Sequence, residues 1–155
     1  MRETFAEYQA RLLALAEGAD PIAVLAATPG EIACAIAGRA AADLRWSPEP
    51  SRWSIAQILS HLADSEIVLA YRLRMILSTP GTPIQAFDQD RWSRAQQSEA
   101  SDAFASLSLF AALRLATVEL LRRVTPEERE RFGVHAERGD ESIGLLMRLH
   151  AGHDR

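Results

Sequence analysis

The stretch WSIAQILSHLADSEIVLAYRLRMIL, residues 53–77, decides the fold of this chain. Ser54 and Gln57 have the spacing of a capping box, in which two side chains satisfy free backbone N–H groups at a helix start. Apolar residues then recur every three or four positions, which is the period of a helix with one buried face. The stretch therefore predicts a helix from residue 55 to about residue 77, roughly 35 Å long at 1.5 Å per residue.

Other helix starts are marked by a capping residue followed by proline, as at Asp20-Pro21 and Thr28-Pro29. We expect further helices at 28–43, from 98 or 101 to about 124, and from 140 or 142 onward. Prolines and missing periodicity predict loops at 46–50, 84–98 and 133–139. The loop at 84–98 is expected to be a long crossover.

The composition favours an all-α fold, because the alternation of β-branched residues that is typical of strands is rare. Four helices with one long crossover loop predict a four-helix bundle. A length of 155 residues fits one domain. We expect this domain to cover residues 1–155, with an N-terminal helical arm at 1–27 and a bundle core at 28–155.

Charge and apolar content exclude several classes of protein. The net charge is -4 and no basic cluster is present, which argues against nucleic-acid binding. The charged N-terminus lacks the apolar segment of a signal peptide, and no stretch approaches the ~18 apolar residues of a membrane span. The single cysteine, Cys34, is expected to be a small core residue in a reducing, cytoplasmic setting.

Two charged residues interrupt the apolar stripes of their helices. Glu66 falls in the middle of the apolar face of the helix at 55–77, and Arg114 falls within the stripe of the next helix. A lone buried charge costs roughly several kcal/mol, so each needs a partner. We hypothesise a buried Glu66–Arg114 ion pair; the alternative is that both residues lie at the rim of the core.

Histidines lie on two separate helices. His61 flanks the buried face of the helix at 55–77, His150 lies on the apolar face of the last helix, and His153 lies at its edge. Neutral imidazole is a common ligand of Zn, Ni and Fe, and a catalytic site needs about three protein ligands. These three histidines are the predicted metal ligands; the alternative is that they are structural or solvated. His135 is expected to be a surface loop residue.

Two aspartates are candidates for catalytic roles. Asp64 lies close to His61 in sequence, where a carboxylate could orient a ligand imidazole through its second nitrogen. Asp88 lies in the expected crossover loop, which could shape a pocket over the bundle. There Asp88 could act as a base or orient a substrate; alternatively, the loop only covers the core.

An ordered set of motifs resembles the DinB/YfiT-like superfamily from about residue 28 to the C-terminus. The motifs are the segment 53–66, Arg72-Leu73-Arg74, Phe87-Asp88-Gln89-Asp90-x-Trp92, Arg114, Gly139 and His150-Ala151-Gly152-His153-Asp154. The resemblance implies a four-helix bundle that binds a divalent metal, with Zn or Ni as the expected ion. It implies one histidine ligand on the second helix and two on the last, spaced i and i+4, and homodimers in many members.

Carried over by position, His61 matches the first ligand of the family and His153 the second. The third would follow four residues after His153, beyond Arg155, so His150 is the alternative ligand. The implied function is a metal-dependent thiol transferase, using a low-molecular-weight thiol cosubstrate, or a hydrolase, in either case acting on a small molecule. The alternative is a non-catalytic helical bundle with an incomplete metal site that binds a ligand or partner.

Overall fold

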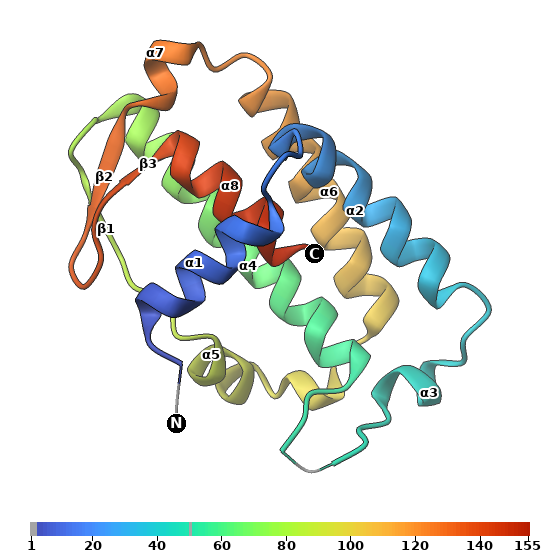
Figure 1. Cartoon of the computed structure of the whole chain (residues 1–155). Helices are drawn as coiled ribbons and strands as arrows, with labels where there is room; N and C mark the ends of the chain where they lie inside the picture. The colour runs from blue at the N-terminus through green and yellow to red at the C-terminus, as the bar shows by residue number, and fades with distance from the viewer. Residues whose placement is uncertain (1–2, 50) are drawn as a thin grey trace.

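A computed structural model describes residues 3–49 and 51–155 of the chain (Figure 1). Its helices are α1 (Phe5–Leu15), α2 (Pro21–Ile36), α3 (Ala41–Arg45), α4 (Ile55–Ser78), α5 (Gln89–Gln96), the 3-10 turn η1 (Ser98–Ala100), α6 (Ala103–Leu121), α7 (Pro126–Arg129) and α8 (Ile143–His153). Its strands are β1 (Pro83–Ile84), β2 (Phe132–His135) and β3 (Gly139–Ser142).

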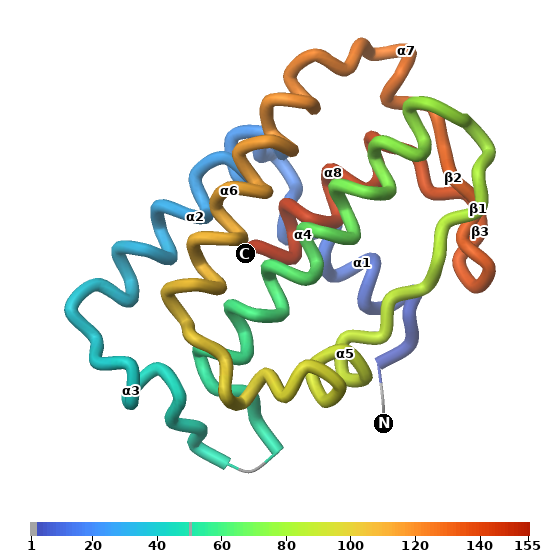
Figure 2. The backbone as a smooth tube through the Cα atoms, turned by 180° about the vertical axis from the view of Figure 1, so that it is seen from behind, coloured from blue at the N-terminus to red at the C-terminus, as the bar shows by residue number. Residues whose placement is uncertain are grey.

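α2, α4, α6 and α8 pack together into a helix bundle. α6 packs against α4 and α2, and α8 contacts both α2 and α4. α1 lies across α8 on the outside of the bundle, as Figures 1 and 2 show from opposite sides. The predicted four-helix bundle is confirmed, with α1 added as a cover over the last helix.

The start of α4 follows the sequence prediction closely. Ser54 Oγ accepts a hydrogen bond from the Gln57 backbone N–H at 3.3 Å, and Gln57 Oε1 accepts one from the Ser54 N–H at 3.0 Å. The helix continues to Ser78, one residue past the expected end. Local signals were sufficient here because both ends of the helix are defined by neighbouring residues.

The predicted helix start at Thr28 is wrong. α2 begins at Pro21, where Asp20 caps it, and continues through Pro29 to Ile36. A proline inside a helix has no N–H for the carbonyl four residues earlier, which here belongs to Leu25. The Leu25 oxygen instead accepts a hydrogen bond from Arg114 at 3.2 Å, so the helix can pass the proline. The division expected between residues 27 and 28 therefore falls inside α2.

Two predicted loops contain regular structure. The segment 84–98 includes α5, and the segment 133–139 includes most of β2 and the turn to β3. β1 pairs with β2 in parallel and β2 with β3 in antiparallel fashion, giving the order β1-β2-β3. The strands have two to four residues, too few for a sequence period to show, so the small sheet was missed.

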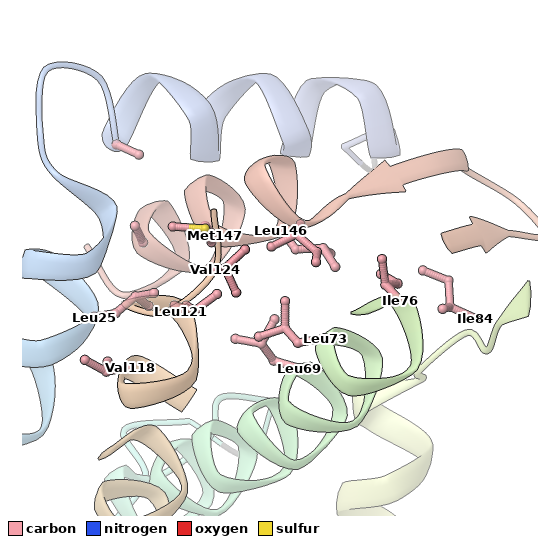
Figure 3. Packing of buried hydrophobic residues seen from close by; sticks show 13 residues of the cluster. Leu25, Leu69, Leu73, Ile76, Ile84, Val118, Leu121, Val124, Leu146 and Met147 are labelled. Carbon is pink, nitrogen blue, oxygen red and sulfur yellow. The ribbon is translucent and has the colours of Figure 1, made fainter. Parts of the chain in front are cut away.

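The main core lies between the four bundle helices (Figure 3). Its labelled side chains include Leu25 from α2, Leu69 and Leu73 from α4, Val118 and Leu121 from α6, and Leu146 and Met147 from α8. A second apolar cluster lies at the other end, around Ile36, Leu44, Ala56, Leu59 and Ala103. The bundle thus has two apolar clusters against which polar side chains can be positioned.

The expected core position of Cys34 is wrong. Cys34 is exposed, because the face of α2 that carries it is not covered by another helix. α6 is long and apolar enough to cross a membrane by length and composition alone, a test that the core helix of a folded protein also passes. In this fold α6 is instead a bundle helix, with Phe110 and the charged Arg114 both buried.

Candidate functional site

A cavity of about 330 Å³ lies between α1, α4, α8 and the hairpin of β2 and β3. Its lining includes Phe5, Tyr8, Gln9 and Leu12 of α1, His61, Ser65 and Arg72 of α4, Phe87 and Gln89, Arg138 and Glu141 of the hairpin, and Leu146, Leu149, His150 and His153 of α8. The volume lies in the range of small-molecule sites. All three histidines predicted as ligands line this one cavity.

Two of these histidines face each other directly. The Nε2 atoms of His61 and His153 lie 3.4 Å apart. A tetrahedral Zn²⁺ ion with Zn–N bonds of about 2.1 Å holds two ligand nitrogens about 3.4 Å apart. The pair therefore fits two positions around one metal ion, and it joins helices from the two halves of the chain.

All three cavity histidines are held in the neutral form. Burial, followed by the neighbouring His153, lowers the pKa of His61 to about 4. Burial also lowers the pKa of His150, well below its ordinary value, and the pKa of His153. A neutral imidazole keeps a free nitrogen lone pair at pH 7, which is the form that binds a metal.

Aromatic side chains surround the His61 ring. Phe87 is stacked on it with ring centroids 6.1 Å apart, and Trp53 lies at 5.2 Å in a tilted arrangement. Trp92 of α5 in turn packs edge-on against Phe87 at 4.8 Å. Phe87 and Trp92 of the crossover segment thus cover His61 and limit the access of water to its ring. On the same helix as His61, the Oγ atom of Ser65 lies 3.5 Å from His61 Nε2.

A buried ion cluster holds the position of His153. Arg114 Nε lies 2.7 Å from Glu66 Oε2, which confirms the predicted ion pair. The same guanidinium also pairs with Asp154, the residue after His153, a partner that the sequence analysis missed. With its bond to the Leu25 carbonyl, Arg114 connects α2, α4, α6 and the end of α8.

The side chain of His150 does not contact the His61–His153 pair through a hydrogen bond among the described residues. Its ring centroid lies 6.4 Å from that of His153, and it lines the same cavity. Within residues 3–49 and 51–155, no group of three His, Cys, Asp or Glu side chains is placed to hold a metal ion. The described part of the chain therefore brings two imidazoles together, those of His61 and His153.

The two predicted catalytic aspartates make structural contacts outside the cavity lining. Asp64 is partly buried and accepts a hydrogen bond from Gln96 Nε2 at 3.1 Å, which joins α4 to α5. Burial raises the pKa of the Asp64 carboxyl, and the Gln96 bond acts in the opposite direction. Asp88 is exposed and caps α5, accepting from the Arg91 backbone N–H at 2.9 Å.

His135 is buried, so its predicted surface position is wrong. Only 1% of the residue is exposed. It ends β2, where the alternation of the strand turns its side chain inward, and its Nδ1 accepts a hydrogen bond from the Glu137 N–H at 3.2 Å. Burial is also the first cause of its lowered pKa.

The cavity also contains charged residues that sequence reasoning did not assign to the site. Arg138 and Glu141 form a double ion pair, with N–O distances of 2.6 and 2.8 Å. Arg72 is 7% exposed and donates to the Gln85 carbonyl. Arg72 could have been found, because it lies on the same stripe of α4 as His61. The hairpin pair could not, because the sequence predicts a loop at Arg138 and no strand at Glu141.

Comparisons with known proteins give a consistent family assignment. The sequence model described as the DinB superfamily matches residues 4–155. A protein of Oceanobacillus iheyensis, provisionally named a metal-dependent hydrolase, is 31% identical over 103 residues, which is 66% of this chain and 59% of that protein. YfiT of Bacillus subtilis, named in the same provisional way, is 27% identical over 74% of this chain and 64% of its own length. The matches thus span less than two thirds of the length of these relatives.

A solved structure supports the fold over a larger part of the chain. YfiT from Bacillus subtilis, described as having an unusual four-helix bundle topology, superposes with a TM-score of 0.79. The superposition covers 99% of this chain and 82% of YfiT, at 21% sequence identity. At this identity the likeness concerns the arrangement of helices and not the reaction.

Proposed function

This chain belongs to the DinB superfamily, and from this premise we propose that it is a divalent-metal-dependent hydrolase of small molecules. The observation that carries the proposal is the 3.4 Å separation of the His61 and His153 Nε2 atoms within a cavity. In this proposal the two imidazoles bind Zn²⁺ or Ni²⁺. The names of the relatives, which call them metal-dependent hydrolases, support the same class of activity.

A bound divalent ion would supply a Lewis acid and a water molecule of lowered pKa. The surrounding residues give the two imidazoles their orientation and protonation state. Asp154 Oδ1 lies 4.0 Å from His153 Nδ1, so its negative charge favours a proton on Nδ1 and leaves Nε2 free. Trp53 and Phe87 fix the His61 ring and restrict water around it.

Further ligands are part of the proposal. Two protein ligands alone bind a metal weakly, and His150 is the remaining histidine of the same cavity. It would serve as a third ligand only after its side chain turns toward the His61–His153 pair. For Asp64, the contact with Gln96 favours a role in holding α5 against α4. For Asp88, capping α5 favours a role in placing Phe87 over His61.

The test is hydrolysis by the whole chain after reconstitution with Zn²⁺ or Ni²⁺. A panel of small esters and amides is assayed with and without a low-molecular-weight thiol, beside His61→Ala and the exposed control Arg74→Gln. We expect metal-dependent turnover in the native protein and the control, and at least a 100-fold loss in His61→Ala. Turnover only with the thiol would assign thiol transfer in place of hydrolysis. Absence of turnover under all conditions would favour the non-catalytic, ligand-binding alternative.

A further inference from the structure

Arg72 is a buried cation without an anionic partner among the described residues. It is 7% exposed, and its one hydrogen bond in this part of the chain goes to the neutral carbonyl of Gln85. Its Nε atom is buried and makes no hydrogen bond. The ion pairs within residues 3–49 and 51–155 do not include Arg72. Arginine keeps its charge under such conditions, so the charge needs compensation from elsewhere.

The cavity beside Arg72 has an uncompensated positive charge. Its charged lining residues are Arg72, Arg138 and Glu141. Glu141 is already bound in a double ion pair with Arg138, and only 3% of its side chain is exposed. One positive charge, that of Arg72, therefore remains free for a ligand.

Arg72 and His61 stand on the same stripe of α4, with Ser65 between them. Their positions are separated by about 16 Å along the helix axis at 1.5 Å per residue. Apolar side chains, with Leu12 and Leu146 among them, line the same cavity. The cavity is thus lined by a buried guanidinium, by imidazoles and by apolar side chains.

We propose that the cavity binds a small amphipathic carboxylate, with the carboxylate on the guanidinium of Arg72 and the apolar body directed along the row toward His61 and His153. Guanidinium and carboxylate form paired, charge-assisted hydrogen bonds. A carboxylate carries one negative charge, which matches the single free charge of Arg72 in the metal-free cavity. A phosphate monoester carries about 1.5 to 2 charges and would exceed it. The placement of the reacting end rests on the proposed function; the binding of the carboxylate does not.

The test uses the whole chain stripped of metal and titrated by calorimetry with 3-phenylpropionate and with its neutral amide, 3-phenylpropanamide. The two ligands have the same shape and differ in charge. We expect the native protein to bind the acid at least ten-fold more tightly than the amide. Arg72→Gln should reduce this preference to less than three-fold, Arg72→Lys should retain part of it, and Arg74→Gln, an exposed residue of the same helix, should keep all of it.

Equal affinity of the native protein for acid and amide would overturn the proposal, and this comparison does not depend on any variant folding. A full preference for the acid in a folded Arg72→Gln variant, as checked by circular dichroism, would also overturn it. Because no metal is present, a failure of the metal site leaves the result unaffected. Conversely, a metal-dependent activity without preference for carboxylates would support the proposed function and reject this inference.

Discussion

The Nε2 atoms of His61 and His153 lie 3.4 Å apart, although 92 positions separate the two residues in the chain. The helices that carry them, α4 and α8, contact each other directly, and both are tied to Arg114 of α6. Arg114 binds Glu66, five residues after His61, and Asp154, directly after His153. The short distance between the two imidazoles therefore depends on the buried ion cluster as well as on the packing of the two helices.

Removal of the central cation should destabilise the fold and the histidine pair together. Arg114→Met leaves Glu66 and Asp154 buried without a counter-charge, and we expect a loss of about 3–5 kcal/mol in the free energy of unfolding. Arg122→Gln, which breaks an exposed ion pair with Glu119, should cost less than about 1 kcal/mol. Urea unfolding measures the change in the free energy of unfolding for both variants. Similar costs for the two variants would show that the buried cluster contributes little.

The packing of α1 on α8 depends on the absence of a side chain at Gly152. A Cβ atom there would lie 1.9 Å from the Leu12 backbone oxygen, so α1 must move away in Gly152→Ala. We expect a loss of roughly 1–3 kcal/mol, as for other overpacked sites. Gly144→Ala on the same helix meets no atom closer than 3.5 Å and should be neutral or stabilising by up to about 1 kcal/mol. Thermal unfolding that ranks the two variants in the opposite order would contradict this account of the α1–α8 contact.

The metal-free protein should lose stability as pH falls from about 6.5 toward 4. The pKa of His61 is about 4 in the folded state, against an ordinary value of 6.5, and those of His150 and His153 are also lowered, each first by burial. At pH values between the folded pKa and the ordinary pKa of these histidines, the unfolded chain binds more protons than the folded chain. A decrease in pH over this range therefore favours unfolding. Urea midpoints should therefore decrease over this range. In His61→Gln the decrease should be smaller; an unchanged pH dependence would contradict the neutral, buried state of His61.

The aromatic cover should control the protonation of His61. Phe87→Ala removes the ring stacked on the imidazole, and the entry of water should raise the His61 pKa from about 4 toward 6.5. Trp46→Ala is the control, because Trp46 is 68% exposed. Titration of the histidine ring resonances by NMR measures the shift. A His61 pKa that stays at its native value in Phe87→Ala would show that other residues exclude the water.

The fold could be predicted from sequence where local signals were sufficient. The capping box and apolar period of α4 located this helix, and a charge within each apolar stripe located the Glu66–Arg114 pair. The helix faces of His61 and His153, together with the family resemblance, led to the expectation that the two share one site. The face on which each residue lies can be predicted from one or two helical turns around it.

The errors concern features that depend on distant residues. Thr28-Pro29 has the same local form as the true helix start at Asp20-Pro21, and the difference comes from Arg114, which satisfies the carbonyl freed by the proline. His135 is buried because β2 pairs with two other short strands. Such tertiary contacts leave no periodic signal in a single sequence.

The most direct test of the account is the titration of metal-free protein with Zn²⁺ by calorimetry, for the native chain and for His61→Ala, His153→Ala and His135→Gln. We predict one ion per chain in the native protein and at least a ten-fold weaker affinity after substitution of either His61 or His153. His135→Gln should retain the native affinity, provided that circular dichroism shows it to be folded. Equal Zn²⁺ binding by the native protein and by both alanine variants, or no binding in any of them, would contradict the assignment of the His61–His153 pair as the metal site.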